Sequence, residues 1–262
     1  MSVVPFGARL AAAMDAHGPL CVGIDPHASL LEAWGLPDSP AGLREFSSRV
    51  LEAVGGRVAA VKPQAAFFER HGSAGLAVLE EVVAAARETG TLSIVDAKRG
   101  DIGSTMGAYA EAFLRDGSPL AGDALTVSPF LGFGSLAPAV ELATATGRGL
   151  FVLCLTSNPE GASVQHARRG AGADTTTVAA SIAASARVAF SFASASAVAL
   201  CAFFSFSSST SSFSLSSLAD FASSSDDSAR ARSAAKSPIA WAPAFSAVRT
   251  SSSDASSGRP KI

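Results

Sequence analysis

The amino-acid sequence predicts an α/β protein folded as a (β/α)8 TIM barrel, and three observations carry this prediction. Short apolar runs typical of buried strands alternate with longer segments whose apolar residues recur every three or four positions, as on amphipathic helices. A polar residue closes each of five strand-like runs, at intervals of 29 to 37 residues, which fits one βα unit. Single barrels commonly reach the 262 residues of this chain.

Five strands and four intervening helices are expected. The strand-like runs are mostly apolar on both faces, as in parallel strands that helices cover. A doubly wound open sheet is the alternative, but it usually has a glycine-rich phosphate turn after its first strand, and "GIDPHASL" is not such a turn. The expected strands are residues 19–26, 58–68, 92–99, 124–130 and 149–158, and the expected helices are residues 41–56, 73–90, 104–117 and 134–147.

The composition changes past about residue 170. Residues 171–262 contain 26 serines but only two glycines and no glutamate. Further barrel units would need glycine turns and charged outer helix faces. Barrel units one to five are therefore recognisable and units six to eight are not. We divide the chain into a barrel portion, residues 1–185, and a Ser/Ala-rich low-complexity tail, residues 186–262.

Charge and hydropathy bear on the partners of the chain. A net charge of −2 gives no general reason to expect nucleic acid or an anionic membrane surface as a partner. Residues 188–206 are apolar at 15 of 19 positions, which brings a membrane span into question. Interspersed serines, small alanines and the lack of basic flanks argue against one. Arg9, Asp15 and His17 interrupt the N-terminal segment, so no signal peptide is expected.

The cysteines and histidines suggest neither a disulfide framework nor a metal site. Cys21, Cys154 and Cys201 lack C-x-x-C spacing and are expected to be reduced residues of a cytoplasmic protein. The four histidines share no spacing typical of metal ligands. We expect neither a metal nor another cofactor.

Four charges occur within the six residues "DAKRGD", directly after an apolar strand-like run. Asp96 and Lys98 are two residues apart, so on an extended strand end their side chains point the same way. Gly100 permits a sharp exit, after which Asp101 can turn toward this site or a neighbouring one. Lys62 closes the preceding strand and can join from an adjacent barrel position. The sequence therefore predicts an alternating array of Lys62, Asp96, Lys98 and Asp101.

Such an array suits a reaction in which a carboxylate leaves as CO2. Asp96 would repel the substrate carboxylate, and Lys98 would offer a proton to the carbon that keeps the electron pair. Stabilisation of the developing carbanion by a fixed ammonium should exceed any ground-state strain. The alternative is an ion-pair network that merely closes the barrel rim. Four charges at the ends of two neighbouring strands favour the chemical interpretation.

Five segments, one at each expected strand, resemble the orotidine 5'-phosphate decarboxylase family, over roughly residues 5–170. Magnesium-dependent sugar-phosphate lyases of the same superfamily share the D-x-K-x-x-D element, but they have an acidic residue where Lys62 stands. Residues 177–189 are also similar to the fifth helix of the family. The five segments are "GIDP", "VKPQAAFFERHG", "IVDAKRGDIGSTMGAYAEAFL", "LTVSPFLGFGSL" and "FVLCLTSNPEGASVQ".

The resemblance implies a homodimeric barrel that converts orotidine 5'-monophosphate to UMP without a cofactor. Lys98 would be the proton donor to C6, and Asp96 would press against the departing CO2. Lys62 would complete the charged network and touch the ribose. The other implied roles are a ribose hydroxyl contact for Asp25, contacts in the partner subunit's site for Asp101 and Thr105, substrate binding for Ile102, and a pyrimidine-edge contact for Ser157. For Asp25 and Ser157, a strand-end cap or turn role remains an equal alternative.

The tail departs from the family pattern. The family binds the substrate phosphate with loops after strands seven and eight, and nothing in residues 188–262 resembles those loops, so no phosphate-binding residue is assigned. We hypothesise that the tail is a frame-shifted reading of the same gene. We expect this chain to have little or no decarboxylase activity, since remote phosphate contacts supply binding energy used in the transition state. A noncatalytic, damaged family member is therefore an alternative.

Overall fold

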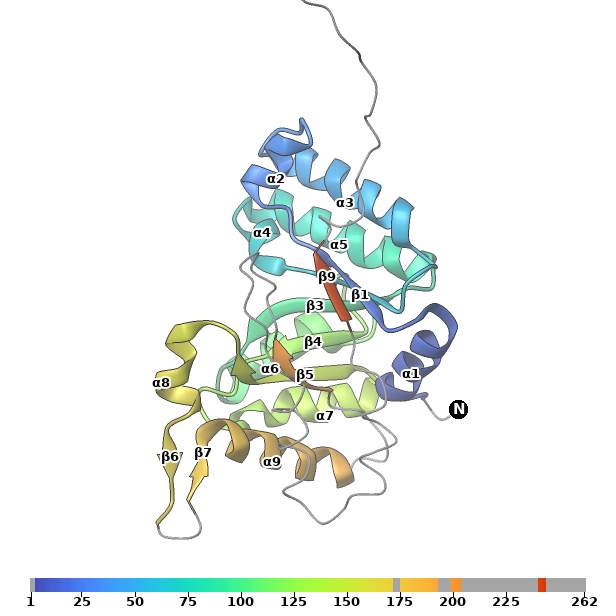
Figure 1. Cartoon of the computed structure of the whole chain (residues 1–262). Coiled ribbons are helices and arrows are strands. Elements are labelled where there is room, and N and C mark those ends of the chain that lie inside the picture. Colours follow the sequence, from blue (N-terminus) through green and yellow to red (C-terminus); the bar gives the residue numbers. More distant parts are fainter. Residues whose placement is uncertain (1–2, 172–174, 193–198, 204–239, 244–262) are drawn as a thin grey trace, which may run out of the picture.

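The computed structural model describes residues 3–171, 175–192, 199–203 and 240–243. Seven parallel strands form one curved sheet in the order β8-β5-β4-β3-β2-β1-β9 (Figure 1). From β1 to β5 the strands are neighbours in the sheet in the order of the sequence, as in a (β/α)8 barrel. Their bounds are β1 Leu20–Ile24, β2 Ala60–Pro63, β3 Leu92–Arg99, β4 Ala124–Val127, β5 Gly149–Thr156, β8 Ala199–Phe203 and β9 Ala240–Pro243.

Apart from α1, which precedes β1, the helices follow strands and lie on the outside of the sheet (Figure 1). Their bounds are α1 Phe6–His17, α2 Ala28–Ala33, α3 Pro40–Val54, α4 Ala65–Glu69, α5 Gly72–Glu88, α6 Gly103–Leu114, the 3-10 helix η1 Phe133–Leu136, α7 Ala137–Thr146, the 3-10 helix η2 Pro159–Gly161, α8 Ala162–Gln165 and α9 Val178–Phe192. A small antiparallel hairpin, β6 Arg168–Arg169 with β7 Thr176–Thr177, precedes α9.

The alternation expected from the sequence is confirmed for all five strands and for the four helices between them. Several strands end a few residues earlier than expected, and the largest difference is in the expected strand 58–68, which ends at Pro63, so that α4 takes up its last residues. The proline closes the strand, and the following "AAFFE" forms a short helix instead. The N-terminal helix α1 and the short helix α2 are additional to the four expected helices.

Two described strands lie within the tail, where the sequence predicts no barrel unit. β8 pairs with β5, and β9 pairs with β1, at the positions that a sixth and an eighth strand hold in a (β/α)8 barrel. Apolar segments of four or five residues carry too little periodicity to be recognised as strands. The rest of the tail, including most of its serine-rich text, lies outside the described residues.

The apolar stretch 188–206 is not a single helix, because α9 ends at Phe192 and residues Ala199–Phe203 form β8. Within the described residues, no helix is long and apolar enough to cross a membrane.

Alternate residues of each strand face two separate apolar layers. The outer layer packs the strands against the helices and includes Val61, Val95 and Leu125. The inner layer is smaller, and α1 closes it at the amino ends of the strands with Phe6 and Leu10. The inner cluster consists of Phe6, Leu10, Cys21, Ala60, Leu92, Ile94, Ala124 and Phe151.

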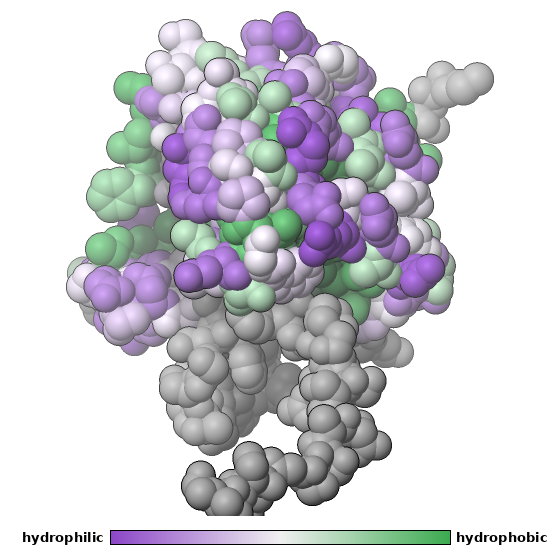
Figure 2. Space-filling view, turned by 90° about the horizontal axis from the view of Figure 1, so that it is seen from above, coloured by the Kyte–Doolittle hydropathy of each residue, from purple (hydrophilic) through white to green (hydrophobic). Residues whose placement is uncertain are grey.

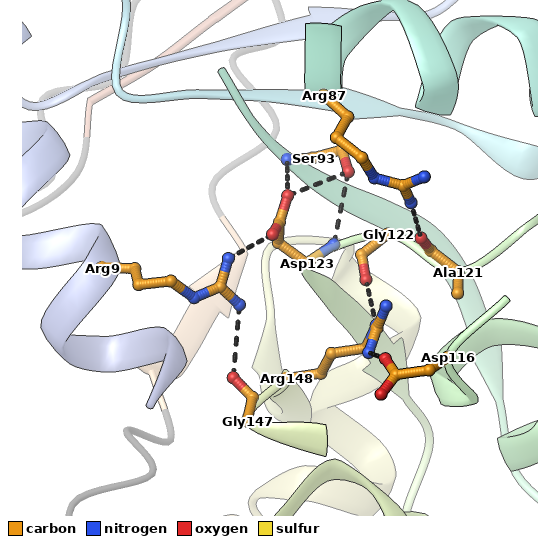
Figure 3. Close-up of polar contacts among 9 residues, drawn as sticks. All are labelled: Arg9, Arg87, Ser93, Asp116, Ala121, Gly122, Asp123, Gly147 and Arg148. Carbon is orange, nitrogen blue, oxygen red and sulfur yellow. Dashed lines mark hydrogen bonds and ion pairs between the residues drawn. The ribbon is translucent and has the colours of Figure 1, made fainter. Parts of the chain in front are cut away.

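A polar network holds the amino ends of the strands together (Figure 3). Asp123, directly before β4, accepts a hydrogen bond of 2.9 Å from the backbone N–H of Ser93 in β3 and forms an ion pair with Arg9 of α1. Arg9 also donates to the carbonyl of Gly147, just before β5. This network fastens α1 to two strands at the end opposite the charged cluster.

The outer helix faces carry the charge that amphipathic helices need. Arg44 of α3 forms an ion pair with Glu81 of α5, and Arg49 forms one with Glu45 one helical turn away. Seen from the side of α2 and α3, strongly hydrophilic residues are interspersed with apolar ones over the surface (Figure 2).

Candidate active site

The inner layer turns from apolar to charged toward the carboxyl ends of the strands. Lys62 follows Ala60 by two residues on β2, and Asp96 follows Ile94 by two on β3, so the strand pleat places both on the inner face. Lys98 continues the same series on β3, and Asp25 directly follows β1. Four charged side chains therefore converge at the end of the barrel where functional groups of this fold are found.

Asp96 lies at the centre of this cluster. Its Oδ2 accepts a hydrogen bond of 2.8 Å from Lys62 Nζ, and its Oδ1 accepts one of 2.6 Å from Lys98 Nζ. The Asp96 side chain is only 1% exposed, whereas that of Lys98 is 41% exposed. The carboxylate is thus held between a buried ammonium and an accessible one.

The two lysines decide the charge of Asp96. Burial alone would raise the pKa of this carboxyl, but Lys62 and Lys98 outweigh burial, so the pKa of Asp96 lies below its ordinary value. Asp96 is therefore an anion at neutral pH despite its burial. A fixed anion beside a proton donor is the arrangement that the sequence predicts for Asp96 and Lys98.

Asp25 behaves differently. Burial raises the pKa of this carboxyl, and the neighbouring Lys62, whose Nζ lies 3.8 Å from Asp25 Oδ1, only partly offsets the effect. The buried Asp25 Oδ1 has no hydrogen-bond partner among the described residues. A buried carboxylate oxygen that lacks a donor costs free energy. The Asp25 side chain as a whole is 33% exposed, so a ligand can reach the rest of the carboxylate.

The backbone at Lys98 is unusual. Among the described residues other than glycine, Lys98 alone has a positive φ, of 50°. The β3–β4 register shifts between Val95 and Arg99, so the strand is irregular where it carries the lysine. Gly100 follows in close contact with β4: a Cβ there would lie 2.3 Å from the carbonyl oxygen of Ser128. Lys98 therefore sits on a tight bend that departs from the regular strand.

Two neutral residues join the charged cluster, although the sequence gave them no role. Gln64 Oε1 lies 3.4 Å from both Lys62 Nζ and Lys98 Nζ. Thr126 Oγ1 lies 2.9 Å from Asp96 Oδ1. Gln64 is two residues after Lys62, and Thr126 is two residues before Ser128, so the strand period alone places both on the inner face. The two-residue alternation of strand side chains is therefore the sequence signal that indicates Gln64 and Thr126.

Asp101 does not join the array within one chain, contrary to the four-residue array that the sequence predicts. Its carboxylate accepts a hydrogen bond of 2.8 Å from the backbone N–H of Ile102, and among the described residues it forms no ion pair. Asp101 lies past the bend, on the segment that leads into α6. Ile102, immediately before α6, and Thr105, in its first turn, are both exposed at the same end of the barrel. Ser157, directly after β5, is exposed there as well.

Comparisons with known proteins show which family the chain resembles. The family model described as "Orotidine 5'-phosphate decarboxylase / HUMPS family" matches residues 18–213. The orotidine 5'-phosphate decarboxylase of Streptomyces coelicolor is 68% identical over 168 residues, which is 64% of this chain and 60% of that protein. That of a Nocardioides species is 63% identical over 166 residues, 63% of this chain and 61% of that protein. The chain thus spans about three fifths of the length of these curated relatives.

Solved structures with the same name superpose on the chain. A crystal structure from Streptomyces avermitilis, assigned as an orotidine 5'-phosphate decarboxylase, matches with a TM-score of 0.68 and 67% identity over 71% of this chain and 64% of that one. The Leishmania donovani OMP decarboxylase matches with a TM-score of 0.57 and 33% identity over 69% of this chain and 63% of that one. These matches confirm the barrel fold.

Proposed function

The chain belongs to the orotidine 5'-phosphate decarboxylase / HUMPS family, and we propose that its barrel portion is built to decarboxylate orotidine 5'-monophosphate to UMP in pyrimidine biosynthesis, without a cofactor. The observation that carries the proposal is the anionic Asp96, buried between Lys62 and Lys98 at the carboxyl ends of the strands. Such a pair matches a reaction that expels a carboxylate and protonates the carbon left behind.

In the proposed reaction, the bond between C6 and the carboxylate carbon breaks and CO2 departs. The electron pair stays on C6 and takes a proton from Lys98 Nζ, which solvent then reprotonates because the Lys98 side chain is accessible. Asp96 faces the departing carboxylate and repels it. The Lys98 ammonium is fixed before the reaction starts, so it stabilises the developing negative charge without reorganisation.

The remaining residues hold the substrate in this proposal. Lys62 and Asp25 form one side of the cluster, where the exposed part of the Asp25 carboxylate accepts a hydrogen bond from a ribose hydroxyl and Lys62 touches the ribose. Ser157, at the end of β5, meets the pyrimidine edge. D25N, made in the chimera described below, keeps the shape but weakens the hydrogen bond accepted from the hydroxyl, so it should raise the Km for substrate more than it lowers kcat.

A magnesium-dependent sugar-phosphate lyase is the second candidate, because the family description includes such relatives and the D-x-K-x-x-D element is shared. Lys62 argues against it. Its ammonium lies 2.8 Å from Asp96 and 3.8 Å from Asp25, so it takes the place between carboxylates that a divalent cation would need. Turnover that is lost on addition of a chelator and restored by magnesium would favour the lyase.

We further propose that the tail beyond about residue 185 is a frame-shifted reading of the family's C-terminal part. Two facts support this: the abrupt change in composition after residue 170, and curated matches that cover only 64% of this chain. The loops that bind phosphate in the family would then be missing, and this chain would turn substrate over slowly or not at all. Resequencing the gene across codons 165 to 195, with an intact mass of the protein, tests the proposal; a clean in-frame read refutes it.

The partner proposed for the chain is a second copy. Exposed apolar side chains cluster on two adjacent loops, Ile102 after β3 and Phe130 and Leu131 after β4, and Gly100 packs against Ser128 where the loops meet. When a second copy covers this surface, Asp101 and Thr105 of one copy reach the charged cluster of the other copy. Wild-type protein should sediment as a dimer, I102D as a monomer, and the control V4D, at an exposed position before α1 at the opposite end of the barrel, as a dimer. A dimeric I102D would contradict this arrangement.

A cytoplasmic location belongs to the same proposal. Cys21 and Cys154 are buried in the barrel, and burial raises the pKa of the Cys154 thiol, which makes that thiol unreactive. Fractionation of the native host, followed by detection of the chain, tests the location.

A chimera separates the barrel portion from the tail. It joins residues 1–170 of this chain to the C-terminal part of the Streptomyces coelicolor relative, which supplies the missing units. The proposal predicts that the chimera consumes orotidine 5'-monophosphate, followed by its ultraviolet absorbance, while the original chain does so slowly or not at all. A folded chimera without turnover would refute the proposed function.

A further inference from the structure

Thr126 connects the two strands that build the charged cluster. It lies on β4, is completely buried, and faces the inner side of the barrel. Its hydroxyl donates a hydrogen bond of 2.9 Å to Asp96 Oδ1 and accepts one of 2.8 Å from the backbone N–H of Lys98. One hydroxyl group therefore contacts both the carboxylate and the backbone of the residue that carries the proton.

The contact to Lys98 replaces a missing strand hydrogen bond. The β3–β4 pairing is regular at Ile94 and Val95 and resumes only at Arg99, so the ladder is interrupted around Lys98. A buried backbone N–H needs an acceptor, and the Thr126 hydroxyl supplies it here. Lys98 is also in the left-handed region, with φ of 50°, which is strained for a residue that has a side chain. Surrounding contacts must hold such a conformation.

The contact to Asp96 fixes the carboxylate plane. Oδ1 accepts from both Thr126 and Lys98 Nζ, while Oδ2 accepts from Lys62 Nζ. Three donors from β2, β3 and β4 thus define the orientation of this one side chain. A threonine donor is neutral, so it orients the anion without adding a third cation to the cluster.

We propose that Thr126 is a positioning residue of the site: its hydroxyl locks the bend that aims Lys98 and fixes the orientation of Asp96. The proposal rests on the proposed function only in taking Lys98 as the proton donor. Thr126 does not touch the reacting carbon. It acts through Asp96 and Lys98.

Three variants of the full chain test the proposal. T126V removes the hydroxyl and keeps the shape, and T126S keeps the hydroxyl. T91V is the matched control, since Thr91 is also buried and its hydroxyl also accepts a backbone N–H, that of Gly56 at 2.7 Å, at the opposite end of β3. The readout is hydrogen exchange of individual backbone amides, with the Ile94 amide of β3 as the internal reference. It needs no substrate, so its result stands apart from whether the chain turns over orotidine 5'-monophosphate.

The Lys98 amide should exchange about tenfold or more faster in T126V than in wild type, relative to Ile94, because its acceptor is gone. In T126S and T91V it should stay within about threefold of wild type, whatever the change in overall stability. Equal Lys98 exchange in T126V and T91V would overturn the proposal. So would accelerated exchange in T126S as large as in T126V.

Discussion

Lys98 Nζ lies 2.6 Å from Asp96 Oδ1, although the Lys98 side chain is 41% exposed and that of Asp96 only 1% exposed. The Lys98 ammonium thus faces the solvent, while the carboxylate that binds it is shielded. On the other side, Lys62 is nearly as buried as Asp96. The two lysines make similar hydrogen bonds to one carboxylate, but burial gives them different energetic roles.

Because Lys62 is buried and Lys98 is partly exposed, replacement by methionine should lower the free energy of unfolding more at position 62 than at position 98. K62M breaks a buried pair and leaves Asp96 poorly compensated, which should lower the free energy of unfolding by about 3–5 kcal/mol. K98M removes a partly exposed partner and should cost about 1 kcal/mol or less. Urea unfolding followed by circular dichroism measures both. Equal losses, or a larger loss in K98M, would contradict the assigned burial of the cluster.

Replacement of Asp25 by asparagine should stabilise the folded protein. Burial raises the pKa of Asp25, so its ionised form costs folding free energy at neutral pH, and this cost disappears as the pH falls through the folded-state pKa toward 3.8. D25N should therefore have a higher Tm than wild type at pH 7, with a difference that shrinks on acidification. D15N, at an exposed position on α1, controls for the change in net charge. A Tm gain in D15N as large as in D25N would mean that net charge, and not burial, explains it.

Asp96 should give the opposite pH dependence. Lys62 and Lys98 outweigh burial and lower the folded-state pKa of Asp96, so its ionised form contributes stability that is present above the ordinary value of 3.8. That contribution is lost as the pH falls from 3.8 through the folded-state pKa. The difference in unfolding free energy between wild type and D96N should therefore narrow in this acid range. A constant difference from pH 7 to pH 3 would show that Asp96 does not titrate as described.

Gly100 should be intolerant of even one methyl group. A Cβ at this position would meet the Ser128 carbonyl oxygen at 2.3 Å, so G100A must separate the end of β3 from β4 and should cost about 1–3 kcal/mol. Gly107, within α6, has no atom within 4 Å of its added Cβ. G107A should instead gain about 0.5–1 kcal/mol from helix propensity. Thermal unfolding of the two variants checks this, and a neutral G100A would argue against the tight bend.

The strand and helix order of the first five units could be predicted because each unit repeats one pattern, an apolar strand closed by a polar residue. Lys62, Asp96 and Lys98 were found because strand alternation fixes their side of the sheet. The left-handed backbone of Lys98 had no sequence signal, since it depends on the interrupted pairing with β4. Gly100 indicated the exit from the strand, but spacing along the chain does not reveal whether Asp101 then turns toward this cluster or away from it. The strands at 199–203 and 240–243 owe their places to pairing with β5 and β1, which no local pattern encodes.

The most direct test of the account is the turnover of orotidine 5'-monophosphate by the chimera and by its K98A variant. The account predicts that the chimera consumes the substrate and that K98A abolishes turnover, because the proton donor is gone while Asp96 and Lys62 remain. Binding of UMP, measured by calorimetry, should remain detectable in K98A and shows that the site is still formed. Turnover in K98A comparable to that of the chimera would remove Lys98 as the proton donor and contradict the central claim.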